Sequence, residues 1–97
     1  MLVGCARKQT VQVPDVTSTN AIPLTTARKS VSGISLQVRG TLGGAAYISA
    51  GNWEKEKLSG IVDWQVYHDW FQPTCVLHYE PVAVTSGTLT VAYTFHE

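Results

Sequence analysis

Apolar and polar residues alternate with a period of two over most of the chain from Val31 onward. This alternation is typical of strands that have one buried and one solvent-facing side. The first run places Ile34, Leu36, Val38 and Leu42 on a single face. Gly43-Gly44 follows and is typical of a hairpin turn, which predicts a second strand over residues 45–50. The first part of the folded domain is therefore expected to be a hairpin.

The alternation continues through the second half of the chain. Leu58, Gly60, Val62, Trp64 and Val66 predict one long strand over residues 57–68. A loop containing Pro73 is expected over 69–74, then strands over 75–79 and 88–95, with a short strand at 82–84 and a turn at 85–87. Five or six antiparallel strands without a convincing helix predict an all-β fold, a small antiparallel β-sandwich or barrel.

The segment before Val31 has a different composition, because residues 6–30 are polar, rich in threonine and interrupted by Pro14 and Pro23. Such a segment is predicted to be an extended N-terminal tether in front of a β-domain over 31–97. The core of so small a domain is marginal by its buried area. Docking onto a partner or self-association would be a natural source of extra stability.

Composition and charge exclude several classes of function. The 97 residues allow one domain, and seven basic and seven acidic side chains give no net charge. Charged residues are only 14% of the chain, which argues against nucleic-acid binding through bulk charge. A hydrophobic fraction of 44% is too high for a wholly disordered chain. No run approaches the roughly 18 to 20 apolar residues of a membrane-spanning helix.

The sequence begins Met1-Leu2-Val3-Gly4-Cys5, and Leu2-Val3-Gly4-Cys5 resembles the lipobox of bacterial lipoproteins. The resemblance implies that the Cys5 thiol carries a diacylglycerol, that the bond after Gly4 is cut, and that several acyl chains anchor the protein. Ala6 resembles the residue found at this place in proteins sorted to the outer membrane. The expected location is therefore the bacterial outer membrane, on its periplasmic or surface side.

The resemblance also sets the expected layout of the chain. Only four residues precede Cys5, whereas a signal peptide needs a basic region and about 7 to 15 apolar residues, so the native start is expected upstream. Residues 1–4 are then the remnant of a signal peptide, 5–30 the lipidated cysteine with a flexible linker, and 31–97 the β-sandwich domain.

Aromatic residues form the most distinctive local composition: Trp53, Trp64, Tyr67, Trp70, Phe71 and Tyr79. One interpretation places Trp64 in the core and lets Tyr67 and the loop pair Trp70-Phe71 cover one end. The other makes Trp53, Tyr67, Trp70 and Phe71 an exposed platform that binds a protein or a sugar. Both interpretations are consistent with the spacing.

The two cysteines show no metal-type spacing to each other. His68, Cys75 and His78 flank one hairpin, which raises a metal site or a thiol–imidazole pair as hypotheses, but no third orienting group is spaced to serve them. Cys75 stands beside Val76 and Leu77 and is most simply a buried thiol. A disulfide between Cys5 and Cys75 is the alternative if Cys5 is not lipidated.

No constellation of residues predicts catalysis or a cofactor. The carboxylates are scattered, and Gly40, Gly43 and Gly44 precede a strand rather than the helix of a phosphate-binding loop. We therefore expect a lipid-anchored interaction module that binds a protein of the cell envelope, as a homo- or hetero-oligomer. A carbohydrate-binding or adhesin-like domain that uses exposed, coplanar aromatic rings is the alternative.

Overall fold

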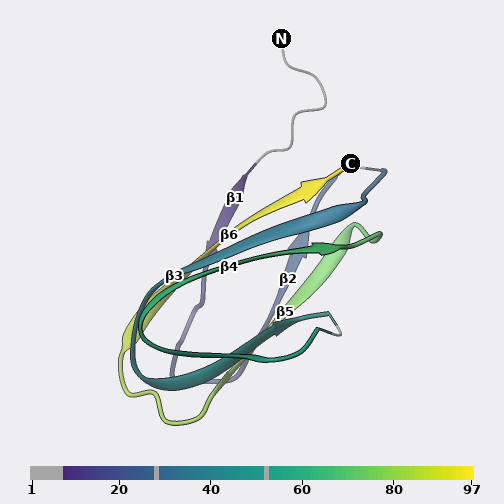
Figure 1. Ribbon diagram of the computed structural model, residues 1–97. Helices are drawn as coiled ribbons and strands as arrows, with labels where there is room; N and C mark the ends of the chain where they lie inside the picture. The colour runs from purple at the N-terminus through teal and green to yellow at the C-terminus, as the bar shows by residue number, and fades with distance from the viewer. Residues whose placement is uncertain (1–7, 28, 52) are drawn as a thin grey trace.

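The structure is a computed structural model that describes residues 8–27, 29–51 and 53–97 (Figure 1). These residues form six antiparallel strands in one curled sheet that has the shape of a half-barrel. In chain order the strands are β1 (Gln9–Gln12), β2 (Asn20–Thr25), β3 (Gly33–Ala50), β4 (Glu56–Asp69), β5 (Thr74–Pro81) and β6 (Gly87–His96). The all-β, antiparallel fold predicted from the alternation is confirmed.

Strand β3 is the centre of the sheet because it pairs with three other strands. Its first half lies beside β6 and its second half beside β5, while β4 follows it along nearly its whole length. Strand β1 pairs with β6 and β2 with β5, so that β1, β2 and β4 each have one edge without a partner in the described sheet. Figure 1 shows the β3–β4 hairpin curling back toward its own base.

The curl arises at glycines in the middle of the hairpin. The pairing of β3 with β4 shifts between Leu42 and Ala45, and Gly44 has a φ of 139° with no room for a Cβ beside the carbonyl oxygen of Ala83. On the facing strand Gly60 has a φ of 63° and pairs with Leu42. Irregularities of this kind bend strands and let them pass from one layer to another. Both strands therefore bend at one place.

This bend corrects one expectation. Gly43-Gly44 was expected to end a strand in a hairpin turn, but residues 33–50 form a single strand. Gly43 instead donates its amide to the carbonyl of Ser86 at 2.8 Å and accepts from the amide of Thr85 at 3.0 Å. The glycines allow β3 to leave β6 and join β5 without a break in the chain.

The core lies inside the curl. Its largest fully buried side chains are Tyr79, Phe95, Leu24, Ile34, Leu36, Ile48, Leu77, Leu89, Val38, Val91 and Cys75. They come from β2, β3, β5 and β6, and they alternate with half-buried or exposed residues except at the two ends of β3, where Gly33 and Ser49 are buried too. On β3, β5 and β6 the period-two pattern of the sequence thus marks the buried face correctly.

The N-terminal segment differs from the predicted linker over 5–30, because its residues 9–12 and 20–25 are strands of the same sheet. Ile22 and Leu24 are buried against the core, as are Val13 and Val16 in the connection between the two strands. The hydroxyl of Tyr79 donates to the carbonyl of Val16 at 2.6 Å in the interior. The predicted boundary at residue 31 therefore does not separate a linker from a domain.

The connection between β1 and β2 is held by Asp15. Its carboxylate accepts from the Thr17 hydroxyl at 2.7 Å, the Thr17 amide at 3.0 Å and the Ser18 hydroxyl at 3.0 Å. These bonds keep the pKa of Asp15 below its ordinary value. Burial, with a contribution from nearby Asp15, raises the pKa of Tyr79. The segment is thus fixed by local hydrogen bonds as well as by packing.

Other sequence expectations are met or corrected locally. The long strand expected over 57–68 is β4, the loop over 70–73 joins it to β5, and the last strand is β6. Residues 82–84 are not a strand, and the amides of Val82 and Ala83 instead donate to the carbonyl of Ala45 at 2.8 and 3.3 Å.

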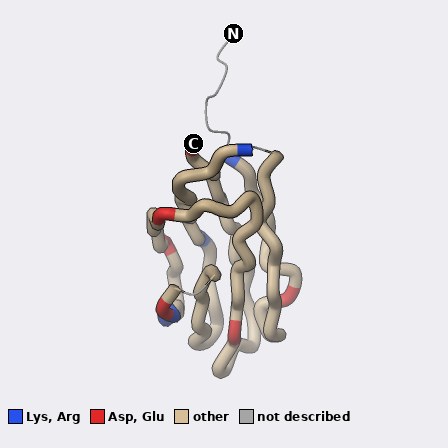
Figure 2. Tube along the Cα trace, turned by 90° about the vertical axis from the view of Figure 1, so that its right-hand side faces the viewer, with Lys and Arg blue, Asp and Glu red and all other residues tan. Residues whose placement is uncertain are grey.

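The charged residues Lys, Arg, Asp and Glu are scattered along the whole trace in Figure 2 rather than gathered on one side.

Candidate functional site

Two of the aromatic residues expected on an exposed platform instead pack together. Trp53 stacks on His68 with ring centroids 4.0 Å apart and planes 25° apart, and it meets Trp70 edge-on at 6.0 Å. The Trp70 ring lies directly against Gly51, where a Cβ has no room, and its Nε1 donates to the carbonyl of Thr74 at 3.1 Å. Both tryptophans are half-buried. They join the tip of the β3–β4 hairpin to its base.

The other two predicted residues are exposed. Tyr67 projects from the outer face of β4 with 54% of its surface accessible, and Phe71 in the following loop is 73% accessible. The Tyr67 ring lies over Gly33 and 5.6 Å from the ring of His96, whose Nε2 is 2.7 Å from the Ser35 hydroxyl. The predicted set of four therefore divides into a packed pair and an exposed pair.

The packed rings do not form the arrangement that sugar stacking requires. Trp53 and Trp70 stand at 90° to each other. A sugar-binding platform of aromatic residues needs exposed rings that lie in one plane.

Ile61 is an exposed residue that the sequence interpretation did not select. It is 89% accessible, which is the highest value among the large apolar side chains that remain exposed. Because it follows Gly60 and precedes the buried Val62, its side chain points to the outer face of β4, where Asp63 and Gln65 are its neighbours. An apolar residue in an otherwise polar series was the signal for it in the sequence.

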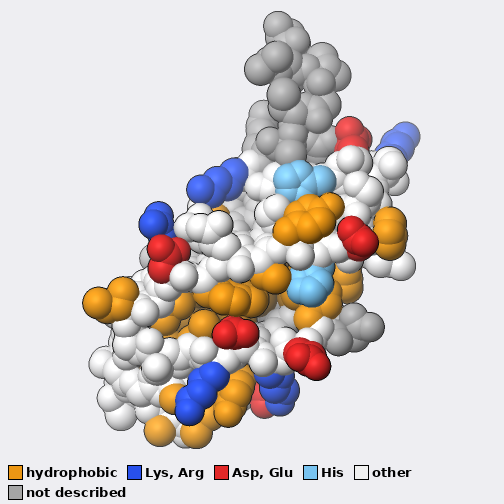
Figure 3. All heavy atoms as spheres, viewed as in Figure 1, with side chains coloured by type: hydrophobic (Ala, Val, Ile, Leu, Met, Phe, Trp, Pro, Cys, Tyr) orange, Lys and Arg blue, Asp and Glu red, His pale blue; other side chains and the backbone are white. Residues whose placement is uncertain are grey.

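The free edge of β4 is the longest unpaired edge in the described sheet. The strand has 14 residues and pairs only with β3. Trp64 and Val66 are half-buried and pack against the core from this edge. In Figure 3 apolar side chains gather in the opening between the two arms of the hairpin, with charged side chains around them. Ile61 and Tyr67 stand on the outer face of the same strand.

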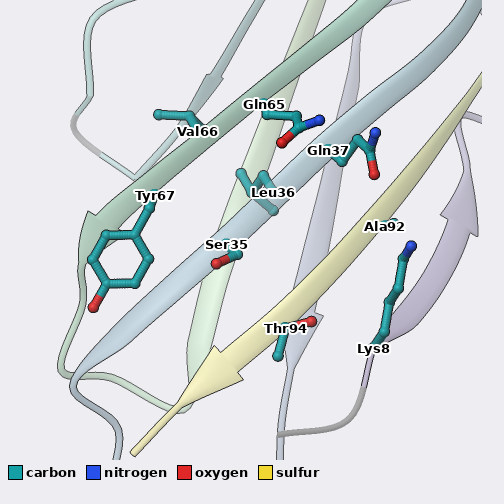
Figure 4. A pocket seen from close by; sticks show the side chains of 9 residues that line it. All are labelled: Lys8, Ser35, Leu36, Gln37, Gln65, Val66, Tyr67, Ala92 and Thr94. Carbon is teal, nitrogen blue, oxygen red and sulfur yellow. The ribbon is translucent and has the colours of Figure 1, made fainter.

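A groove with both polar and apolar lining crosses the outer face of the sheet beside this edge (Figure 4). It has a volume of about 350 Å³ and is lined by Lys8, Ser35, Leu36, Gln37, Gln65, Val66, Tyr67, Ala92 and Thr94. The strand registers place Thr10, Ala92, Gln37 and Gln65 in one row across four strands. The groove therefore offers amide and hydroxyl groups, with a single ammonium at one end and a phenol at the other.

The charges next to the groove neutralise each other. The Arg39 Nε lies 3.4 Å from the Asp63 Oδ1, and both side chains are largely exposed. The Gln37 Nε2 donates to the same carboxylate oxygen at 3.4 Å. Exposed pairs of this kind contribute little to stability, about 0 to 1 kcal/mol. Their effect is to leave this part of the surface nearly neutral.

His68, Cys75 and His78 are not brought together. Cys75 is a free thiol inside the core, and burial raises its pKa to about 11. His78 follows on the opposite, exposed face of β5, while His68 stacks on Trp53. Over the residues that the structure describes, no group of three His, Cys, Asp or Glu side chains is placed to hold a metal ion. The hypothesis of a buried thiol is thus confirmed for Cys75.

Comparisons of the chain with protein-family models, with curated proteins and with solved structures found no match. Cys5, the candidate lipidation site, lies outside the described residues. Within the described ranges no helix has the length and apolar character needed to cross a membrane.

Proposed function

We propose that the protein is a lipid-anchored protein of a bacterial envelope that acts as a protein–protein interaction module. The free edge of β4, with exposed Ile61 and Tyr67 on it and Phe71 just beyond it, is the observation that carries this proposal. An unpaired strand edge presents backbone amides and carbonyls to a partner strand, and exposed apolar side chains beside it add specific contacts. The lipid anchor rests on the lipobox-like Leu2-Val3-Gly4-Cys5.

The other strand edges of the sheet are less suited to a partner. Strand β1 has four residues, and β2 carries Pro23 in its middle. Short edges and prolines are devices that prevent a strand from pairing with another chain. Strand β4 contains no proline, and its arm after Gly60 keeps a regular register with β3 from Ile61 to Asp69. This arm therefore supports the proposed contact best.

Photo-crosslinking in the producing cells tests the interaction. A photoreactive residue at Ile61 or Tyr67 should capture a defined protein, whereas the same residue at Val82, which is 64% accessible and lies after β5, on the other side of β3 from β4, should not. Equal and unspecific capture from all three positions would contradict the proposal.

The anchor has a separate test. Cys5→Ser should move the protein from the membrane fraction to the soluble fraction, and mass spectrometry of the unsubstituted protein should show acyl groups on Cys5. A soluble protein with an unmodified Cys5 would end the lipoprotein interpretation without affecting the contact at β4.

A carbohydrate-binding domain is the second candidate, and the groove on the outer face of the sheet favours it. The groove offers amides from Gln37 and Gln65, hydroxyls, and the Tyr67 ring at one end, which are groups that hydrogen-bond and stack on sugars. A glycan array tests it, with Gln65→Ala expected to abolish binding and Gln12→Ala, outside the groove lining, as the control. No binding to any glycan would eliminate this candidate.

A further inference from the structure

We infer that the partner of the β4 edge is a second copy of this chain, and that two copies pair their β4 strands antiparallel about a two-fold axis at Trp64. This inference rests on the proposed function and names its partner. It starts from the regular arm of β4 between Ile61 and Asp69, whose outer edge has no partner strand in the described sheet. Symmetric pairing of one edge with itself is the simplest closed assembly, because it leaves no β4 edge open for a third copy.

The side chains of this arm determine the register. Ile61, Asp63, Gln65, Tyr67 and Asp69 alternate with the residues that face the core side. A two-fold axis at Trp64 places each residue opposite the one equally far on the other side of position 64. Ile61 then faces Tyr67 of the second copy, and Asp63 faces Gln65.

In this register the residues on the core side of β4 also face apolar residues of the second copy. Trp64 faces Trp64 of the second copy, and Val62 faces Val66. Directly opposed side chains have Cβ atoms about 4.5 to 5.5 Å apart, and aromatic and β-branched pairs stabilise a sheet. Trp64 and Val66 are only half-buried in the isolated chain, and they pack against the core. Pairing would cover them, together with the exposed Ile61.

The neighbouring registers are worse for identifiable reasons. With an axis at Asp63, the Asp63 carboxylates of the two copies face each other. With an axis at Val66, Asp63 of each copy faces Asp69 of the other copy. Directly opposed like charges destabilise a pair of strands. An axis at Gln65 avoids this, but it sets the apolar Ile61 against the Asp69 carboxylate. Of these four registers, only the axis at Trp64 has neither a like-charge pair nor Ile61 opposite a charge.

Cysteine crosslinking tests the register directly in a full-length Cys5→Ser background, where Cys75 is fully buried and does not interfere. A mixture of Ile61→Cys and Tyr67→Cys proteins should form a covalent heterodimer under mild oxidation, because these positions face each other. Neither variant should crosslink when it is alone. Gln65→Cys alone should also remain uncrosslinked, since it becomes a symmetric pair only if the axis lies at Gln65.

Charge variants test the same register without a covalent bond. Gln65→Asp should weaken association several-fold in sedimentation equilibrium, because it creates two like-charge pairs with Asp63 across the axis. Gln65→Lys should strengthen it by a similar factor. Gln12→Asp and Gln12→Lys on β1 are the matched controls, because Gln12 is also an exposed glutamine on a sheet edge, and they should leave association unchanged. Circular dichroism verifies that each variant is folded.

The outcomes separate this inference from the proposed function. Covalent heterodimers together with opposite effects of Asp and Lys at position 65 support the inference. A chain that stays monomeric at every concentration, or a Gln65→Cys protein that crosslinks to itself, overturns it. If the chain is monomeric but a photoreactive residue at Tyr67 captures a different protein in cells, the proposed function holds with another partner. If it captures nothing, both are wrong.

Discussion

Leu24→Ala should strongly destabilise the protein, because the N-terminal segment is part of the sheet. Leu24 is fully buried in β2, opposite Cys75 of β5. Truncation of a buried leucine costs about 3 kcal/mol, from the lost burial and the cavity that remains. A domain of this size loses about 4 to 8 °C in melting temperature for each kcal/mol, so the expected drop is about 12 to 24 °C. Thermal unfolding of the full chain followed by circular dichroism measures it.

The adjacent residue supplies the control. Thr25→Ala changes an exposed side chain on the same strand and should shift the free energy of unfolding by no more than about 0.5 kcal/mol. The β2 amides that are hydrogen-bonded to β5 should also exchange as slowly as the β5 amides that are bonded to β2. If Leu24→Ala melts at the temperature of the unsubstituted protein, β2 is not part of the cooperative unit and the burial argument fails.

Three further predictions concern the packed aromatic and thiol groups. Trp70→Ala should cost about 2 to 3 kcal/mol in urea unfolding, less than a fully buried tryptophan, whereas the exposed Phe71→Ala should change little. Tyr79→Phe should cost about 1 to 3 kcal/mol, because the buried carbonyl of Val16 loses its donor. Cys75 ionises near 9.0 when unfolded but has a native pKa of about 11, so stability should be complete below pH 9 and fall as pH rises to 11. Cys75→Ala should make that fall shallower, and an unchanged slope would contradict the assignment.

The strands with a regular alternation could be predicted from the sequence, because a strand with one buried face carries apolar residues at every second position. Strands β4 and β6 were found in this way with boundaries close to those observed. Strand β3 was divided in two at Gly43-Gly44. Glycine permits a tight turn and a bend within a strand for the same reason, its freedom at positive φ. Whether the chain turns or bends at these glycines is decided by the pairing of β3 with β5 and β6, which are distant in the sequence.

The N-terminal strands were missed for a different reason. Strand β1 has only four residues, and β2 contains Pro23, which lacks an amide for a sheet bond. Both are edge strands with one partner each, so the proline is tolerated on the unpaired side. The alternation of Ile22 and Leu24 with polar or small neighbours was present, but a strand of this length is stable only on a sheet that already exists.

The candidate site was predicted only in part, because loop residues far apart in the sequence contact each other through the bend. Trp53 and Trp70 lie in different loops, and one of the two interpretations of the sequence placed both on an exposed platform. The curl of the β3–β4 hairpin carries Gly51 and Trp53 back onto His68 and Trp70. Tyr67 and Phe71 remain exposed because none of the described elements packs over the outer face of β4 or over the loop that follows it.

The same bend explains why one long edge stays open. A curled sheet can remove its free edges by closing into a barrel. Here one edge of β3 is paired with β4, and its other edge is paired first with β6 and then with β5. Among the described strands, β4 pairs with β3 alone, and none is left to cover its other edge. Its exposed edge carries Ile61 at 89% accessibility, although a short, proline-containing or densely charged edge would be the ordinary protection. An edge that retains an exposed isoleucine and tyrosine, in a described sheet whose other free edges are short or interrupted by proline, is the feature on which the proposed strand pairing rests.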